Sequence, residues 1–451
     1  MPARATYHCE LAWLGGDHAV ADVQIDVDGD RIVSVTPGVS APGHAVRLSG
    51  LTLPGLANTH SHAFHRALRG RTHDGVGSFW TWRDQMYGLA ASLDPDTYHR
   101  LARATFAEMV MAGVTCVGEF HYLHHQPDGT PYRDANVIGE ALSAAAADAG
   151  LRITLLDTCY LQGGIDQPPN PVQRRFSDVR VDAWVERVEA LCERTTSPTA
   201  RVGAAVHSVR AVDPESIARV AAWAIERGVP LHAHVSEQPA ENHACVEAFA
   251  LTPMELLAER HALDAAFTAV HATHLTEHDV RLLQMHRSTV CMCPTTERDL
   301  ADGIGPTARF LEAEVPIALG SDSHAVIDLF EEARAVELDE RLASLVRGNH
   351  TVPSLLEVAT VHGHRSLGWA DAGRLAVGDL ADLVTVDLRS VRTAGASPDH
   401  ALATVVYAAA TADVRHVVIG GRVVVRDGRH VSIDVAGELS DSIAAAWRAV
   451  P

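Results

Sequence analysis

Eight short apolar runs alternate with helical patterns between residues 51 and 320, and this order leaves few folds open. Each run has the length and composition of a buried strand. The runs lie at residues 51–58, 114–119, 152–157, 202–207, 229–235, 267–271, 288–293 and 315–320. Amphipathic helical patterns separate them, at 94–112, 134–149, 214–226 and 253–261. Eight buried strands that alternate with helices predict an α/β fold, the (β/α)8 TIM barrel.

The two ends of the chain show a different pattern, in which apolar and polar residues alternate as in strands with one buried face. Residues 17–36 surround an Asp-Gly-Asp turn sequence typical of a hairpin, and residues 381–428 alternate around a Gly-Gly turn. We therefore expect residues 1–54 and 372–451 to pair into one small β-sandwich domain. The barrel would then span residues 55–371.

The chain carries a large acidic excess, since 37 basic and 57 acidic side chains give a formal net charge of −20. This charge repels nucleic acid phosphates and anionic lipid, so we expect neither as a partner. The sequence contains no apolar run of about eighteen residues or more, so we expect no membrane-spanning helix. The opening MPARATYHCELAWLGG has no continuous apolar block of a secretory signal. We expect a soluble, cytoplasmic protein.

Polar side chains stand where six of the eight runs end. In chain order these ends carry His60 and His62, Glu119, His207 and Arg210, His234 and Glu237, His271, and Asp322. A barrel of this kind places its reactive residues at the C-terminal ends of its strands. The sequence therefore predicts a polar, metal-competent site on one rim.

His60 and His62 are two residues apart on extended backbone, so both imidazoles leave the same side and can bind one ion. The pair alone is a weak signal in a chain with 27 histidines. His234 and Asp322 would complete a set of three neutral imidazoles and one carboxylate. Such a set suits Zn²⁺, with Fe²⁺ or Mn²⁺ as alternatives. A divalent ion there would lower the pKa of a bound water toward ~7.

Other interpretations stay open for the histidines and the aspartate. His234 could be a satisfied core histidine, and Asp322 could cap the helix predicted at 327–344. We expect His232 to face the opposite side of its strand from His234 and to pack against the barrel. The pair at residues 362 and 364 lies in a helical pattern, which favours a structural role.

The segments PGLANTHSHAF, HAHVSEQ and LGSDSH make the chain similar to the amidohydrolase superfamily, in its mononuclear deaminase branch. The resemblance covers the whole chain. It implies that one divalent metal ion is held by His60, His62, His234 and Asp322. It also implies catalytic roles for Glu237, His271 and Asp322. A dinuclear site with a carboxylated lysine is not expected, because no lysine follows His234 closely or ends the fourth run.

Longer segments, HSHAFHRALRG, FWTWRDQMY, GVTCVGEFHYLHH and HSVRAV, resemble the formimidoylglutamate deiminase family. This resemblance implies hydrolysis of N-formimino-L-glutamate to N-formyl-L-glutamate and ammonia, a step of bacterial histidine degradation. It also implies a homodimer. One departure is His65, which stands where the family commonly has glutamine.

A substrate with two carboxylates needs positive or hydroxyl donors within this acidic chain. We predict that Arg83, Tyr122, His207 and Arg210 supply them from loops after the first, second and fourth runs. The planar fork of arginine matches a carboxylate, although each arginine could instead form a surface ion pair. The segments 70–80 and 121–135 are candidates for covering the site.

Two rival functions remain. Another mononuclear deaminase, acting on guanine, an adenine derivative or a triazine, would share the metal site and lack the need for carboxylate-binding arginines. The aromatic content of 5% slightly disfavours a stacking pocket for a purine ring. A barrel that binds metal without catalysis is the second rival, and the complete set of catalytic side chains argues against it.

Overall fold

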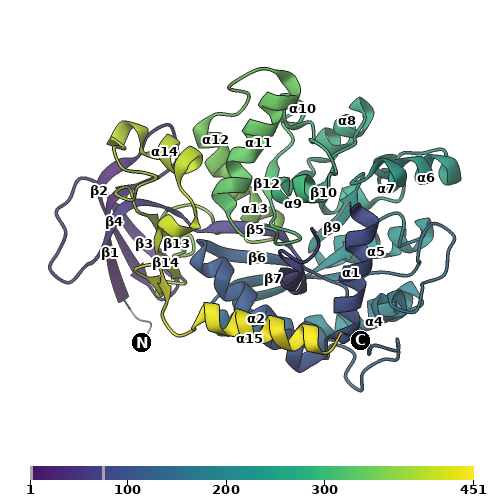
Figure 1. Ribbon diagram of the computed structural model, residues 1–451. Helices are drawn as coiled ribbons and strands as arrows, with labels where there is room; N and C mark the ends of the chain where they lie inside the picture. The colour runs from purple at the N-terminus through teal and green to yellow at the C-terminus, as the bar shows by residue number, and fades with distance from the viewer. Residues whose placement is uncertain (1–3, 74–76, 451) are drawn as a thin grey trace.

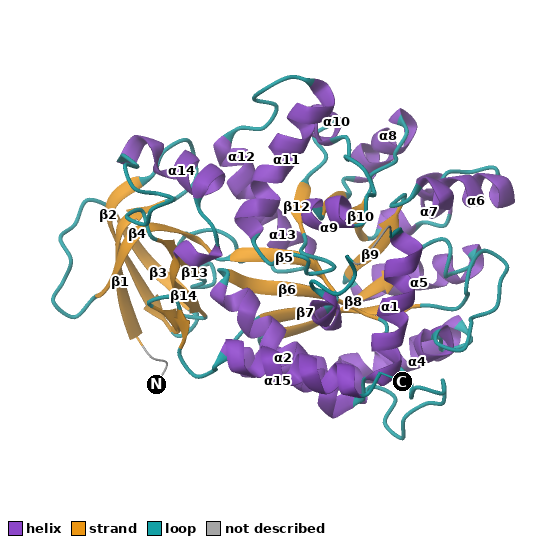
Figure 2. Cartoon of the chain, viewed as in Figure 1, coloured by secondary structure: helices purple, strands orange, loops and turns teal. Residues whose placement is uncertain are grey.

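The computed structural model describes residues 4–73 and 77–450, which form a parallel barrel and a separate β domain (Figures 1 and 2). The barrel sheet runs in chain order from β5 to β12. Its strands are β5 (Leu56–Ser61), β6 (Val114–His121), β7 (Arg152–Cys159), β8 (Ala200–Val206), β9 (Pro230–Val235), β10 (Ala266–His271), β11 (Thr289–Met292) and β12 (Ile317–Leu319). A parallel bridge between Ser61 and Asp322 closes the sheet beyond β12. The predicted (β/α)8 barrel is confirmed.

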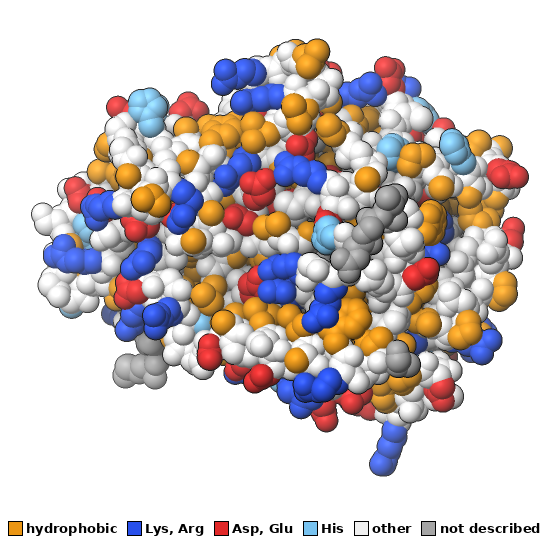
Figure 3. Space-filling view, viewed as in Figure 1, with side chains coloured by type: hydrophobic (Ala, Val, Ile, Leu, Met, Phe, Trp, Pro, Cys, Tyr) orange, Lys and Arg blue, Asp and Glu red, His pale blue; other side chains and the backbone are white. Residues whose placement is uncertain are grey.

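Helices surround these strands in Figure 1. They are α1 (Phe79–Ser92), α2 (Pro95–Met111), α3 (Val137–Ala149), α4 (Val181–Arg194), α5 (Pro214–Arg227), α6 (Pro239–Phe249), α7 (Pro253–Glu259), α8 (Glu277–His286), α9 (Pro294–Asp299), α10 (Thr307–Glu312) and α11 (Leu329–Ser344). None of the helices among the described residues is long and apolar enough to cross a bilayer. On the face in Figure 3, basic and acidic side chains are interspersed.

The predicted helix starts follow from capping chemistry. Asp94 accepts a hydrogen bond from the Thr97 N–H at 2.7 Å, and Pro95 opens α2 without a donor to satisfy. Asp213 does the same for the Ser216 N–H at 3.0 Å at the start of α5. The helix predicted from residue 134 begins later, at Val137, because the Asp134 side chain accepts from the Asn136 N–H and forms a turn.

The apolar run at 51–58 is two strands rather than one. β4 (Val46–Pro54) belongs to the β domain, and β5 begins the barrel after Gly55. A Cβ atom at Gly55 would lie 2.2 Å from the Thr115 side chain, so the chain passes between the two sheets where only glycine fits. The sequence does not show where one strand ends and the next begins, because both strands are buried and equally apolar.

The terminal strands form one sheet in the order β16-β15-β14-β13-β4-β1-β2-β3. They are β1 (Arg4–Ala12), β2 (Val20–Asp28), β3 (Arg31–Thr36), β4, β13 (Leu383–Val386), β14 (Val414–Ile419), β15 (Arg422–Arg426) and β16 (Arg429–His430). The sheet curls, so that Gly421 lies against Val27 and a separate apolar core is enclosed. A separate β domain from both ends of the chain is thus confirmed, whereas the exact boundaries at 54/55 and 371/372 stay a prediction.

Two C-terminal segments pack on the barrel itself. The helical stretch from α12 (Val352–Glu357) to α13 (Gly363–Ser366) and the residues after it lie across the N-terminal ends of the strands, where Thr154 donates to the Leu367 carbonyl at 2.8 Å. After α14 (Ala401–Ala408) and the last strands, α15 (Val435–Arg448) runs beside α2 (Figure 1). Trp447 anchors it by donating to the Ala67 carbonyl at 2.8 Å.

A buried ion pair joins the barrel to the β domain. Arg152 of β7 donates to Asp382, just before β13, with Nε–Oδ2 at 2.8 Å and Nη2–Oδ1 at 3.2 Å. Both side chains are buried, and Asp382 also accepts from the Gly420 N–H at 2.7 Å. Removing one member of such a pair leaves an uncompensated buried charge.

We therefore expect Asp382→Ala to lower the free energy of unfolding by about 3–5 kcal/mol, because Arg152 would remain buried and unpaired. Urea denaturation followed by circular dichroism measures the change. Arg4→Ala is the matched control, since its pair with Asp28 lies at the surface and contributes about 0–1 kcal/mol. Equal destabilisation by the two variants would contradict a role for the buried pair.

Candidate active site

A cavity of 280 Å³ opens at the C-terminal ends of the barrel strands. The residues predicted from the strand ends line its floor, with His62 directly after β5, His234 from β9, His271 from β10 and Asp322 after β12. His60 lies directly beneath, fully buried. The structure therefore brings together every residue that the sequence assigned to metal binding.

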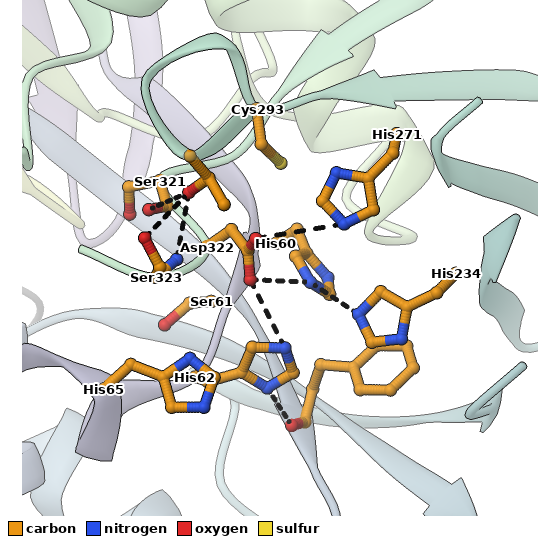
Figure 4. Close-up of polar contacts among 12 residues, drawn as sticks. His60, Ser61, His62, His65, His234, His271, Cys293, Ser321, Asp322 and Ser323 are labelled. Atoms are coloured by element: carbon orange, nitrogen blue, oxygen red, sulfur yellow. Dashed lines mark hydrogen bonds and ion pairs between the residues drawn. The ribbon is translucent and has the colours of Figure 1, made fainter. Parts of the chain in front are cut away.

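Three imidazole nitrogens and one carboxylate face a common point (Figure 4). Asp322 Oδ1 lies 3.3 Å from His60 Nε2 and 3.4 Å from His62 Nε2. His234 Nε2 lies 3.1 Å from His60 Nε2. His271 stands slightly apart, with its Nε2 3.8 Å from Asp322 Oδ2. The first four side chains are close enough to share one ion, and His271 borders the same space.

Hydrogen bonds on the far side of two rings show that this point suits a cation. His62 Nδ1 lies 2.9 Å from the Phe120 carbonyl, which can only accept, so this nitrogen carries the proton. His234 Nδ1 makes the same contact with the His207 carbonyl at 2.9 Å. The Nε2 lone pairs therefore point at Asp322 and at His60. Two neutral nitrogens whose lone pairs are directed into this cluster are donors that a cation can bind.

Burial keeps the imidazoles in the neutral form that metals bind. It lowers the pKa of His62 to about 3 and lowers that of His234 well below the usual value. The pKa of Asp322, which burial alone would raise, is lowered by its contacts with His60. Neutral nitrogens beside an ionised carboxylate form a donor set suited to a divalent transition metal.

Glu119 holds the turn that presents His60 and His62, and the sequence did not single it out for this role. Its carboxylate accepts from the Ser61 hydroxyl at 2.6 Å and from the Ala63 N–H at 2.7 Å. Burial raises the pKa of Glu119 to about 8. An acidic residue at the end of the second strand was visible in the sequence, but its partners were not.

Two acidic side chains flank His271. Glu237 Oε1 lies 3.7 Å from His271 Nε2, and Glu297 Oε1 lies 3.4 Å from His271 Nδ1. Glu297 also accepts from the Cys293 N–H at 2.8 Å, which fixes its orientation. Burial alone would lower the pKa of His271, but these carboxylates and Asp322 raise it well above the usual value. Sequence reasoning missed Glu297, because it starts a short helix after β11 rather than ending a strand.

Backbone strain marks the same rim. Ser236, His271 and Asp322 have φ angles of 52°, 66° and 38°, in the left-handed region that non-glycine residues rarely adopt. Each costs on the order of 1–3 kcal/mol and is retained only where the surrounding structure enforces it. The strain turns the chain sharply at the strand ends, and the side chains of His271 and Asp322 line the cavity there.

The four predicted substrate-binding residues all line the cavity. Tyr122 and His207 follow β6 and β8 directly, and Arg210 lies three residues further. Arg83 was expected on a loop, but it lies within α1, where its guanidinium stacks on Trp80 at 4.4 Å. The helix forms because Ser78 provides its N-terminal cap. Residues 74–76 of the segment 70–80 lie outside the described residues.

His65 is buried in the cavity wall, and its Nε2 lies 3.1 Å from the Tyr122 hydroxyl. It therefore positions Tyr122 beside the ligand cluster. The connection 121–135 is tied to the barrel, since the N–H groups of His124 and His125 both donate to the Arg175 carbonyl.

The prediction for His232 was wrong. Residues two apart in a strand face the same side, so His232 and His234 both point into the barrel. His232 lies one layer deeper, 3.2 Å from the Ser366 carbonyl. His364 has the structural role expected for it, since its Nδ1 lies 3.0 Å from the Thr360 carbonyl within the helical stretch.

A second buried group, formed by His121, His124 and Asp157, is less suited to a metal. Asp157 accepts two hydrogen bonds from Arg187, at 2.7 and 2.8 Å, and one from Trp184 at 2.9 Å. With this carboxylate engaged by a guanidinium, two imidazoles remain as ligands. We assign this group to packing between β6 and β7.

A dinuclear centre bridged by a carboxylated lysine is ruled out by composition, because the chain contains no lysine. All of its 37 basic residues are arginine. The candidate ligands at this rim therefore cannot be joined to a second ion by such a bridge.

Comparison with known proteins agrees with this geometry. The amidohydrolase family model matches residues 51–424. A formimidoylglutamate deiminase from Pseudomonas aeruginosa is 36% identical over 440 residues, covering 93% of this chain and 96% of that protein. A 5-methylthioadenosine/S-adenosylhomocysteine deaminase from Natronomonas pharaonis is 31% identical, covering 92% of this chain and 90% of that protein.

Solved structures show the same fold. An amidohydrolase from Brucella melitensis superposes with a TM-score of 0.88 at 30% identity, covering 98% of this chain and all of that one. An adenosine deaminase from Xanthomonas campestris, crystallised with bound zinc, has a TM-score of 0.85 at 24% identity and covers 99% of this chain and 98% of its own. Together with the family match over most of the chain, these likenesses identify the protein as a member of the amidohydrolase family, a hydrolase of its deaminase group that acts on C–N bonds.

Proposed function

We propose that the chain hydrolyses N-formimino-L-glutamate to N-formyl-L-glutamate and ammonia. The observation that carries the proposal is the presence of two arginines, Arg83 and Arg210, in the same cavity as the metal-ligand cluster. A substrate with two carboxylates and one formimino carbon matches that arrangement. The 36% identical relative from Pseudomonas aeruginosa, named formimidoylglutamate deiminase, supports the same substrate.

The metal-binding residues of this proposal are His60, His62, His234 and Asp322. Nitrogen and oxygen donors in this number suit Zn²⁺, with Fe²⁺ or Mn²⁺ as alternatives. A bound divalent ion supplies Lewis acidity, which polarises the reacting group and acidifies water.

The chain's own residues move the protons. Asp322 and His271, 3.8 Å apart, orient the attacking water and accept its proton. Glu237, next to His271, passes a proton to the leaving nitrogen. Water forms a C–O bond at the formimino carbon, and one of its protons converts the C=NH group to C–NH₂. The C–NH₂ bond then breaks, and the nitrogen takes up the second proton of the water and leaves as ammonia. The remaining oxygen becomes the formyl oxygen of the product, so the reaction needs no other reactant.

Recognition of the carboxylates falls to side chains around the cavity mouth. Arg83 stacks on Trp80 and on Tyr87, at 4.4 and 5.5 Å, which holds its planar fork in place. Tyr122 and His207 offer a hydroxyl and an imidazole closer to the ligand cluster. In a chain with a net charge of −20, an anionic substrate depends on such local donors.

A ring deaminase is the second candidate, because the cavity has several aromatic side chains, among them Phe79, Trp82 and Phe176. The relative from Natronomonas pharaonis is named for a purine nucleoside substrate. Aromatic faces stack on such rings. Two arginines in the same cavity have no evident partner on a neutral purine, which makes this candidate second. A cytoplasmic homodimer stays a prediction.

The decisive experiment incubates the purified protein with N-formimino-L-glutamate and follows ammonia release. We expect release at a kcat on the order of 1–10³ s⁻¹, lost after chelator treatment and restored by Zn²⁺. Release of ammonia from 5-methylthioadenosine or guanine, without release from N-formimino-L-glutamate, would contradict the proposed substrate and favour a ring deaminase.

His234→Ala should reduce bound zinc from roughly one ion per chain to near zero, because a structural or catalytic zinc site needs its third imidazole. His232→Gln is the matched control, two residues away on the same strand and the same face. We expect it to retain zinc, since His232 contacts Ser366 rather than the ligand cluster. Metal analysis after dialysis distinguishes the two variants. Equal loss of zinc from both would contradict the assignment of His234 as a metal ligand.

Glu237→Gln should leave zinc content unchanged and lower kcat about 10²- to 10⁴-fold, as expected for loss of a general acid–base group. The amide keeps the size of the side chain but cannot exchange a proton. Steady-state rates and metal analysis on the same preparation test both parts. Turnover near that of the wild type would remove Glu237 from the mechanism.

A further inference from the structure

Arg210 contacts two carboxylates at the cavity. Its Nη2 donates to Glu237 Oε2 at 3.3 Å, and its Nε lies 3.1 Å from Glu241 Oε2. The guanidinium also lies over the Phe79 ring, with its carbon 5.9 Å from the ring centre. The arginine predicted to bind substrate is therefore already paired with the proposed catalytic acid.

Glu241 is the fixed member of this group. It is buried in α6, and its Oε1 accepts from the Ser236 N–H at 3.1 Å. The contact of its Oε2 with Arg210 is an ion pair without the alignment of a hydrogen bond. Glu241 thus attracts Arg210 by charge, without a directional hydrogen bond. The side chain of Arg210 is 18% exposed.

The two oxygens of Glu237 have different neighbours. Oε1 faces His271 at 3.7 Å, and Oε2 accepts from Arg210. An oxygen that is engaged by a guanidinium is a poor partner for the leaving nitrogen of a substrate. Proton transfer through Oε2 therefore requires Arg210 to give up this contact.

We propose that Arg210 is a substrate-operated latch: a carboxylate of the substrate draws the guanidinium off Glu237, while Glu241 keeps it anchored, and Glu237 is thereby released for proton transfer. Glu241 is in this view a positioning residue that acts through Arg210. The inference rests on the proposed function, because it assumes an anionic substrate at Arg210.

In this proposal, the binding of a substrate carboxylate to Arg210 increases the rate of the reaction. A substrate carboxylate offers Arg210 a third acceptor, and the contact with Glu237 is the one that it replaces, since Glu241 is held by the backbone. A substrate with the same reacting group but no carboxylate leaves Glu237 paired and reacts slowly. Specificity then arises from the rate as well as from affinity.

The test compares N-formimino-L-glutamate with N-propylformamidine, an amidine that has the same reacting group but no carboxylate. Arg210→Met should lower kcat/KM for the dicarboxylate about a hundredfold, and it should raise kcat/KM for this amidine about tenfold, because a charge-assisted contact on Glu237 is removed. A purely structural role for Arg210 predicts no such gain, and a general repulsion between arginine and the amidinium cation predicts the same gain when Arg83 is replaced. An unchanged or lower rate with the amidine would overturn the latch.

Two further variants complete the experiment. The double variant R210M/E241Q also neutralises Glu241, the buried carboxylate that R210M leaves without its arginine, so the gain with the amidine should persist there even where R210M alone folds poorly. Arg83→Met removes the other arginine of the cavity, which does not contact Glu237, and should lower turnover of the dicarboxylate without a gain for the amidine. An equal gain in Arg83→Met would also overturn the latch.

The outcome for the wild type is read separately. If it releases no ammonia from N-formimino-L-glutamate, the proposed substrate fails. If it does so while R210M and R210M/E241Q bring no gain for the amidine, the latch fails and the proposed function stands.

Discussion

The closure of the barrel brings the candidate metal ligands together. The Asp322 N–H donates to the His60 carbonyl at 3.0 Å, and the His62 N–H lies 3.4 Å from the Asp322 carbonyl. Asn58 reinforces the seam by accepting from the Ser321 N–H at 2.9 Å. These contacts bring the first and last strands together, although their residues are far apart in sequence. Three of the four ligands stand on this seam, so an open sheet would have no site.

The site gathers more negative charge than an apolar protein interior tolerates. Glu237, Glu241, Glu297 and Asp322 are all buried around one cavity. Arg210 and His271 balance part of this charge, and the proposed divalent cation would balance more of it. Buried ion pairs contribute little net stability, because desolvation offsets their attraction. The stability of the fold comes instead from the apolar layers between strands and helices, which allows the rim to keep strained and charged residues.

The sequence could predict which residues at the strand ends lie together, because a parallel barrel brings all of these ends to one rim wherever they lie in the chain. His60, His62, His234 and Asp322 were found in this way, and so were Glu237 and His271. Glu119, Glu241 and Glu297 were not assigned their roles, because each acts through a partner that only folding brings near. The error for His232 came from the side of the strand assigned to it, whereas Arg83 lines the cavity but lies on a helix rather than on the expected loop.

By itself the sequence determined the alternation of strand and helix, the residues at the strand ends and the lack of any lysine, since these depend on local composition and on periodicity. Only the tertiary structure decided where β4 gives way to β5, which tautomers the ligand histidines adopt, and that Arg210 is paired with Glu237. Those features depend on distances between segments separated by many residues. Local patterns carry no information about such distances, because they are set by how the whole barrel packs and closes.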